Sequence, residues 1–463
     1  MSKLGANDHD DDHDGGGGRL TDLICGTRAM NAIWSPRQTV QSMLDVEAAL
    51  ARACAAHGVI PLQAVAPIVA ACDAAQIDTA ALMASAAAGG NLAIPLVRQL
   101  TARVADVDAD AAKYVHWGAT SQDIIDTGTV LQLRATLALL EPALAGLGDA
   151  LARQAQRHRD TPMIGRTWLQ QALPITLGLK FAQWLDGVGR HRARLGDVRA
   201  RCLALQFGGA AGTLASLREH AGAVAASLAG DLGLALPDTP WHTQRDRVVE
   251  AGASFGMLIG SLGKIARDIS LQMQTEVGEL AEPAAAGKGG SSTMPHKRNP
   301  VGCAAALSAA VRAPHLVGML FSGMVQEHER ALGGWQAEWE ALPELARLAG
   351  GALAQITAIV TDIEVDTGRL ARNLALTDGL IMGEAVMLAL GDRIGRLAAH
   401  TLVEHASHRA IAEQRTLFDV LSEDEAVSRD LSREQLTALL TPANYVGQAH
   451  AFVDAVVAHH HRL

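Results

Sequence analysis

The sequence predicts an all-α protein built around a long central helix bundle. Hydrophobic residues make up 49% of the 463 residues and aromatic residues only 3%, and alanine and leucine dominate the apolar set. These two residues lose little free energy on entering a helix. A β-sandwich or barrel would instead need Val, Thr, Tyr and Phe in alternation, and the chain has only 2 Tyr and 6 Phe.

Charge and cysteine content restrict the class of protein further. The 39 basic and 49 acidic residues give a net charge of -10, which disfavours binding to nucleic acid or to anionic membranes. The five cysteines are scattered and form no CxxC pair, which favours free thiols in a cytoplasmic protein. The longest uncharged stretch, residues 79–97, contains glycines and a proline, so we interpret it as two buried elements and not as a membrane span.

The first long helix is expected to start at Ser35 and Pro36. Serine is a good N-cap, and proline is favoured at the first helical position. Apolar residues then recur at spacings of three and four over residues 40–54, which places them on one helix face. Gly58 and Pro61 are expected to end this helix.

Two later segments, residues 135–159 and 250–277, contain no helix breaker other than isolated glycines or prolines. They predict the long helices of the central bundle. The expected organisation is a disordered leader (residues 1–18), an N-terminal helical domain (19–116), the central helical bundle (117–368) and a C-terminal helical domain (369–463).

The segment with the clearest chemistry is residues 287–300, GKGGSSTMPHKRNP. Its glycines allow a mobile loop, and two hydroxyls, Ser291 and Ser292, follow them. Lys297 and Asn299 lead into the next expected helix, whose N-terminus can hold an anion. A serine beside an ammonium group and backbone donors is a candidate proton-transfer group for a carboxylate substrate. On the residues alone, a flexible loop before an ordinary helix start explains the segment equally well.

Residues 290–300 closely resemble the signature of the fumarase/aspartase superfamily, which includes the argininosuccinate and adenylosuccinate lyases. The resemblance implies an all-α homotetramer in which three subunits contribute to each active site. It also implies that Ser291 is the catalytic base and that Lys297 and Asn299 bind the substrate carboxylate. Ser292 and Met294 are expected beside the substrate.

A second segment, HWGATSQDIIDT at residues 116–127, resembles the other Thr-Ser stretch of the superfamily. The resemblance implies that Thr120 and Ser121 bind a carboxylate at the start of a bundle helix. The alternative is that one of them simply caps this helix. For His116, substrate contact and a place in the core both stay open.

A third segment, GRTWLQQALP at residues 165–174, resembles a region that normally reads Thr-His-x-Gln. Adenylosuccinate lyases use that histidine as a general acid, and here its position holds Trp168. The resemblance makes Arg166, Thr167, Trp168 and Gln170 candidates for substrate contact. A classical C–N lyase would therefore lack its acid.

Further departures from the adenylosuccinate lyases point the same way. Asn91 stands where those lyases have a second active-site histidine, whereas Arg330 matches them. Trp335 and Trp339 replace the residues that would grip a nucleotide phosphate. A phosphate needs charged or forked donors, which indoles do not supply. A nucleotide substrate is therefore not expected.

These features resemble the superfamily branch that cyclises a carboxylated muconate to a lactone in protocatechuate catabolism, by the β-ketoadipate pathway. In the reverse direction the leaving group is a carboxylate, whose conjugate acid has a pKa of about 4, so it departs without a proton. An amine needs a proton, and a positioned acid is worth about 10²–10⁴ in rate. Loss of the acid at residue 168 would cripple a C–N lyase and cost a lactone-forming isomerase little.

The expected small-molecule substrate carries three carboxylates, and the candidate cations are Arg166, Arg245, Lys297 and Arg330, with Gln244 next to one of them. No metal-ligand spacing is apparent, and the chemistry needs neither metal nor cofactor. Two alternatives stay open. One is a C–N or C–O lyase of the same superfamily acting on a succinyl-type substrate, and the other is a non-catalytic helical scaffold on the same fold.

Overall fold

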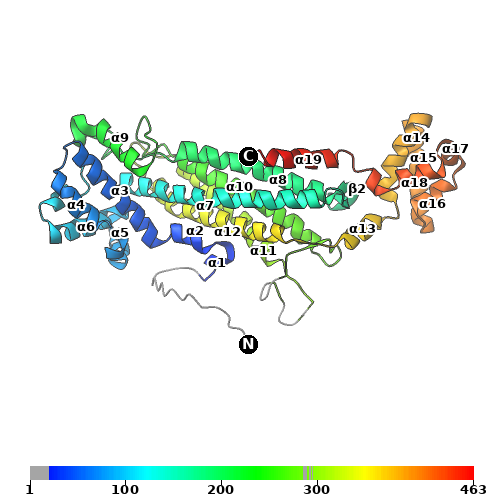
Figure 1. Cartoon of the computed structure of the whole chain (residues 1–463), viewed down its shortest axis with the longest axis horizontal. Coiled ribbons are helices and arrows are strands. Elements are labelled where there is room, and N and C mark those ends of the chain that lie inside the picture. Colours follow the sequence, from blue (N-terminus) through cyan, green and yellow to red (C-terminus); the bar gives the residue numbers. More distant parts are fainter. Residues whose placement is uncertain (1–19, 285–288, 291–293, 295, 463) are drawn as a thin grey trace.

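The computed structural model describes residues 20–284, 289–290, 294 and 296–462. Within them the chain is an elongated, almost entirely helical rod, which confirms the predicted all-α class (Figure 1). The predicted leader and the candidate residues Ser291 and Ser292 lie outside the described residues. In the described part, strands are restricted to two small two-stranded sheets.

The N-terminal end of the rod is a cluster of helices around α3 (Pro36–Ala56). This helix begins as predicted, because Ser35 Oγ accepts a hydrogen bond from the Gln38 N–H at 3.2 Å and Pro36 is the first helical residue. It ends before Gly58, which has a φ of +69°. The other helices at this end are α4 (Val65–Ala71), α5 (Thr79–Gly89), α6 (Ala93–Val107) and α9 (Ala221–Leu232). The short helices α1 (Asp22–Cys25) and α2 (Arg28–Ile33) both contact α12 (Gly334–Thr361) of the central bundle.

The prediction of two buried elements over residues 79–97 is wrong for the first of them. In α5 only Leu82 is buried, and Met83 is 63% exposed. This helix is uncharged and yet exposed. It consists largely of alanines, whose small side chains can face solvent at little cost in free energy. The second element, α6, buries Leu96 and Leu100 as expected.

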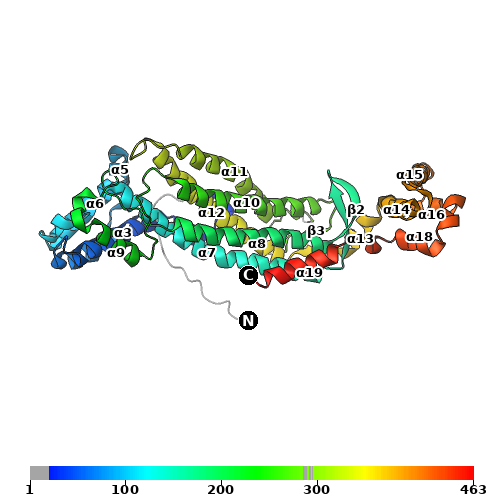
Figure 2. The same ribbon diagram turned by 90° about the horizontal axis from the view of Figure 1, so that it is seen from above.

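Five long helices lie side by side and form the central bundle (Figures 1 and 2). Fully buried side chains such as Leu137, Phe181 and Phe255 fill the space between them. The longest helix has 37 residues, which corresponds to about 55 Å at 1.5 Å per residue. The bundle helices are α7 (Ser121–Arg157), α8 (Leu177–Cys202), α10 (Asp246–Gln272), α11 (Val301–Gly323) and α12 (Gly334–Thr361).

A β-hairpin follows directly after α7. Its strands, β1 (Pro162–Thr167) and β2 (Gln170–Thr176), pair antiparallel, and the two-residue turn between them is Trp168-Leu169. Both turn residues have positive φ, +53° and +63°, as a tight type I′-like turn requires. Beside the hairpin, β3 (Leu280–Ala281) pairs with β4 (Glu364–Val365). The sequence contains no glycine at the turn, so this hairpin was not predicted.

The C-terminal end of the rod has a second hydrophobic core of its own. Its buried residues run from Val386 to Leu436, separate from the main core. The last helix returns to pack on α8 and α7, so it belongs to the main core (Figure 1). The predicted boundary after residue 368 stays a prediction. The helices are α13 (Thr367–Ala375), α14 (Gly383–Ile394), α15 (Arg396–Glu413), α16 (Leu417–Ser422), α17 (Glu425–Asp430), α18 (Arg433–Leu439) and α19 (Ala449–His460).

By length and composition alone, α7, α10 and α11 could each cross a membrane. In the structure α7 and α10 pack into the bundle, where they enclose buried charged residues. Helix α11 differs because it leaves apolar side chains exposed, among them Val311 at 68% and Phe321 at 54%. Among the described residues of the single chain, no element covers this apolar face.

Candidate active site

The predicted site residues fall into three groups along the rod. The α7 group surrounds the N-terminal end of α7, the hairpin group lies on β1–β2, and the loop group precedes α11. The α7 group comprises His116, Thr120, Ser121, Gln244, Arg245 and Arg330. The hairpin group comprises Arg166, Thr167, Trp168 and Gln170, and the loop group comprises Met294, Lys297 and Asn299. Ser291 and Ser292 belong to the same sequence segment but lie outside the described residues.

Thr120 stands at the centre of the α7 group. It is the residue before α7, and its N–H donates to Asp123 Oδ2 at 3.0 Å, within the first turn. Its hydroxyl accepts a hydrogen bond from Arg330 Nη1 at 3.0 Å. Thr120 therefore caps the helix and also holds a predicted substrate-binding arginine. Ser121, the first helical residue, is half-buried beside it.

His116 forms an ion pair with a buried carboxylate. Its Nδ1 lies 2.6 Å from Oε1 of Glu47, which projects from α3 and is 1% exposed. Burial disfavours the charged imidazole, but the negative charge and the hydrogen bond of Glu47 outweigh burial and raise the pKa of His116. His116 has a φ of +58°, so the pair anchors the strained turn that leads to Thr120.

This pair predicts a pH-dependent contribution to stability. Because the pKa of His116 is raised in the folded state, the pair stabilises the fold fully below about pH 6.5, the unfolded value, and less as pH rises through the raised pKa. We expect His116→Asn to lower the thermal unfolding midpoint more at about pH 6 than at about pH 9. An equal loss at both pH values would contradict the pairing.

Arg245 is the site residue whose predicted role the geometry opposes. Its side chain is 2% exposed and its guanidinium lies between two buried carboxylates, 2.7 Å from Asp126 and 2.5 Å from Glu338. These carboxylates favour the cation and keep its pKa above the ordinary value despite burial. No surface is left on this group for a substrate carboxylate. Arg245 therefore joins α10 to α7 and α12, and a substrate role is not supported.

The two tryptophans expected in the place of phosphate-binding residues lie on α12 next to this network. Trp335 is 3% exposed and its indole N–H donates to Asp126 Oδ1 at 2.8 Å. Trp339 packs edge-on against it, with ring centroids 4.9 Å apart. Both rings thus help fill the interior. Gln244, in contrast, is exposed near this end of α7.

In the hairpin group, Arg166 is also held by a buried carboxylate. Its two Nη atoms bind the two carboxylate oxygens of Glu279 at 2.8 and 2.6 Å, and Glu279 is fully buried. This forked pair fastens β1 to the chain that precedes β3. Arg166 is therefore a neutralised anchor, while Trp168 at the hairpin tip is 98% exposed. Thr167 and Gln170 flank the tip and are also exposed.

The two ends of the loop-group segment are hydrogen-bonded to each other. Asn299 N–H donates to the Gly289 carbonyl at 2.8 Å, and Gly290 forms a β-bridge with Arg298. The Arg298 guanidinium in turn pairs with Glu364 at 2.7 Å. Between these ends Lys297 and Met294 are exposed, and the Lys297 N–H donates to the Met294 carbonyl at 3.0 Å.

The N-terminus of α11, predicted to hold a substrate anion, is already occupied by a side chain. The carboxylate of Glu282, which is 4% exposed, accepts hydrogen bonds from the N–H groups of Gly302 at 3.2 Å and Cys303 at 2.8 Å. These are donors that a bound anion would use. These two N–H groups are therefore not free for a substrate anion in this chain, and binding by Lys297 and Asn299 stays a prediction.

The three groups do not meet within one chain. The α7 group lies at one end of α7, and the hairpin follows its other end, about 55 Å away by the helix rise (Figures 1 and 2). The loop group lies near the hairpin end, because Arg166 binds Glu279 just before β3 and Glu282 binds the start of α11. One chain alone cannot place Arg330 beside Lys297.

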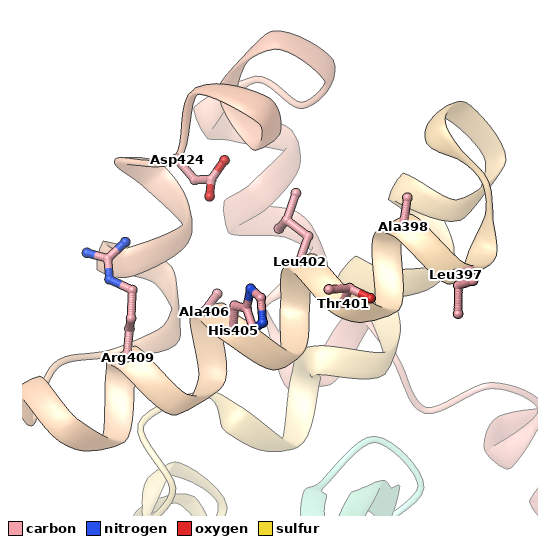
Figure 3. Close-up of a pocket in the computed structure, with 8 residues that line it drawn as sticks. All are labelled: Leu397, Ala398, Thr401, Leu402, His405, Ala406, Arg409 and Asp424. Carbon is pink, nitrogen blue, oxygen red and sulfur yellow. The ribbon is translucent and has the colours of Figure 1, made fainter.

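An open pocket of about 610 Å³ lies elsewhere, between α15 and the start of α17 (Figure 3). Its polar groups include His405, Arg409 and Asp424, and Arg409 is already paired with Glu413 at 3.2 Å. None of the predicted site residues lines it. The pocket is therefore not the site expected from the sequence.

The family assignment follows from comparison with known proteins. The family described as "Lyase" matches residues 26–315, and "Adenylosuccinate lyase C-terminus" matches residues 379–456. The chain belongs to the lyase family. This confirms the resemblance to the fumarase/aspartase superfamily, since a fumarate lyase from Mesorhizobium has the same fold with a TM-score of 0.86 at 40% identity, over 94% of this chain and 98% of that one.

Two relatives are closer to this lyase-family chain. It is 57% identical to a 3-carboxy-cis,cis-muconate cycloisomerase from Pseudomonas aeruginosa, over 96% of this chain and 97% of that protein. The crystal structure of the 3-carboxy-cis,cis-muconate lactonizing enzyme from Pseudomonas putida superposes with a TM-score of 0.92 at 52% identity, covering 96% of this chain and 99% of that one.

Sequence reasoning missed the buried acids that hold the candidate residues of this lyase-family chain. Glu47 holds His116 and Glu279 holds Arg166, and neither acid was singled out. A partial signal existed for Glu47, which follows Met43 by four residues and Leu44 by three and therefore falls on the apolar face of its helix. No comparable signal marked Glu279, because its partner lies 113 residues away in the sequence.

Proposed function

We propose that this protein is a 3-carboxy-cis,cis-muconate cycloisomerase that forms 4-carboxymuconolactone in the protocatechuate branch of the β-ketoadipate pathway. The observation that carries the proposal is Trp168. It takes the place of the acid of the C–N lyases, in a chain that retains Ser291, Lys297, Asn299 and Arg330. Relatives that are 46–57% identical over at least 90% of the chain bear the cycloisomerase name.

In the proposed reaction one substrate carboxylate adds to a double bond, and the carbon next to another carboxylate gains a proton. Ser291 transfers this proton. Lys297 and Asn299 stabilise the carboxylate that becomes enediolate-like in the transition state. Thr120 and Arg330, already hydrogen-bonded to each other, bind a further carboxylate. The addition step needs no external acid, since the reverse leaving group is a carboxylate.

The site is proposed to form between chains of a cytoplasmic homotetramer. The α7 group of one chain would lie beside the hairpin and loop groups of other chains. Only such an arrangement can bring the three groups together, because they are far apart within one chain. The uncovered apolar face of α11, with Val311 and Phe321, offers a surface for subunit contact. The exposed Trp168 would then be covered by another subunit and line the pocket for a planar diene.

Mixing the pure protein with 3-carboxy-cis,cis-muconate tests the proposal. We expect the ultraviolet absorbance of the conjugated diene to fall as the lactone forms, without added metal or cofactor. Unchanged absorbance at high enzyme concentration would overturn the proposal. A second candidate is a lyase for a succinyl-type substrate, because a nitrosuccinate lyase from Streptomyces davaonensis is 41% identical over 95% of the chain. Parallel assays with nitrosuccinate and adenylosuccinate distinguish the two.

Replacing Trp168 with histidine is expected not to accelerate lactone formation. The histidine would add an acid that a carboxylate leaving group does not need, while loss of the large ring would leave space for water beside the substrate. We expect a lower kcat and no lyase activity on adenylosuccinate. Steady-state kinetics with both substrates measure this. A tenfold faster cyclisation would show that an acid limits the wild-type enzyme.

A further inference from the structure

We propose that Asp123 is the positioning residue of this active site, because one buried carboxylate joins the three segments that hold the Arg330 loop (residues 324–333). This inference rests on the proposed function, in which Arg330 binds a substrate carboxylate. Asp123 lies in the first turn of α7 and is 1% exposed. It is separated from Arg330 by other residues and acts through them.

Four hydrogen bonds converge on the Asp123 carboxylate. Oδ1 accepts from Gly208 N–H at 2.9 Å and pairs with His242 Nε2 at 2.8 Å. Oδ2 accepts from Gly209 N–H at 2.9 Å and from Thr120 N–H at 3.0 Å. Both oxygens are fully used and buried, so Asp123 cannot itself bind substrate or transfer a proton. Its function is to hold these three segments together.

Each of the three segments then contacts the Arg330 loop. From the first segment, Thr120 Oγ1 accepts from Arg330 Nη1 at 3.0 Å. From the second, the carbonyl of Ala210, next to Gly209, accepts from Arg330 Nη2 at 3.0 Å. From the third, Thr243 Oγ1, next to His242, donates to the His328 carbonyl at 2.9 Å. The orientation of the guanidinium therefore depends on groups that Asp123 holds.

The backbone near the carboxylate is adapted to this close approach. A Cβ on Gly208 would lie 2.7 Å from Pro240 Cβ and 2.8 Å from His242 Cε1, so a side chain there would displace the histidine. Gly209 has a φ of +68°. His328, a non-glycine residue, has a φ of +47°, so the Arg330 loop is held in a conformation that costs free energy. Such strain persists only where surrounding contacts enforce it.

Asp123→Asn tests the inference with almost no change in shape. In either orientation the amide nitrogen would face a backbone N–H that now donates to the carboxylate, Gly208 N–H on one side or Gly209 and Thr120 N–H on the other, so at least one hydrogen bond is lost. We expect kcat/KM for the muconate to fall about 10²-fold, since small misplacements of a binding group have effects of this size. If Asp123 acts through Arg330, the double variant Asp123→Asn/Arg330→Met should lose little more than Arg330→Met alone.

The matched control is Leu137→Ala, a fully buried change further along the same helix that destabilises the protein without touching this network. Its effect on kcat/KM should be small and should multiply with that of Arg330→Met. Multiplicative losses for the Asp123 pair would overturn the inference. If Asp123→Asn does not fold, Thr243→Val replaces it in the double-variant test, because it removes the hydroxyl that donates to the His328 carbonyl. Little added loss in Thr243→Val/Arg330→Met would support the inference, and multiplicative losses would overturn it.

A crystal structure of the Asp123→Asn variant separates this inference from the proposed function. We expect Arg330 to lose its hydrogen bonds to Thr120 and Ala210. An unmoved Arg330 would overturn the positioning role whatever the substrate is. Wild-type protein that does not convert the muconate would instead refute the proposed function, and the crystal structure would still decide the role of Asp123.

Discussion

Ser291→Ala is expected to lower kcat for lactone formation by about 10²- to 10⁴-fold, the usual range for loss of a proton-transfer group. Helical content and the thermal unfolding midpoint should change little, because Ser291 belongs to a Gly-rich segment of the sequence and the change removes a single hydroxyl. The neighbouring contacts between Gly289 and Asn299 and between Gly290 and Arg298 do not involve this side chain. Steady-state kinetics and circular dichroism of the pure variant measure both expectations.

Ser292→Ala is the matched control for this prediction. It removes the same atom from the adjacent residue, so both variants have the same effect on the composition of the segment. Because Ser292 is expected beside the substrate, Ser292→Ala can change KM, but we expect it to keep a kcat far closer to wild type, since the superfamily resemblance gives the proton-transfer role to Ser291. If Ser291→Ala kept more than about a tenth of the wild-type rate, it would not be the proton-transfer group.

The helices could be predicted from the sequence because their signals are local. Helix α3 starts at Ser35 and Pro36, because the serine side chain caps the helix and the proline ring fixes φ near its helical value. Both signals come from adjacent residues in the sequence. Thr120 precedes α7, where its N–H donates to Asp123 three residues later, which is also a local signal. The β1–β2 hairpin was missed because its turn, Trp168-Leu169, has positive φ without glycine or asparagine, so turn chemistry gives no warning.

The site could be predicted only in part, because its groups are held by contacts between distant residues. The motifs identified Thr120 and Arg330, which are 210 residues apart in the chain and hydrogen-bonded in the structure. They could not show that Arg245 is enclosed by Asp126 and Glu338, since an arginine in a motif looks the same whether its partner is substrate or protein. Burial is a property of the packed helices.

The separation of the three groups leads to a second large effect. Lys297→Met and Arg330→Met are each expected to lower kcat/KM by about 10²-fold or more, because each removes a charge that binds substrate carboxylate. Lys297 belongs to the loop group and Arg330 to the α7 group, at opposite ends of the bundle. If each site takes these groups from different chains, co-assembly of the two inactive variants should restore activity. Random mixing leaves about a quarter of the sites with both groups intact.

Co-expression of the two variants with different affinity tags, followed by purification through both tags, gives the mixed oligomers for this assay. The control is the mixture of Lys297→Met with Asn299→Ala, two changes in the same loop group. Every site in that mixture takes its loop group from a defective chain, so no activity should return. Restored activity in the first mixture and none in the second would place the site between chains. If neither mixture recovers activity, Lys297 and Arg330 of one chain serve the same site. The active chain would then have to adopt a conformation in which the two ends of the bundle lie together, unlike the elongated structure described above.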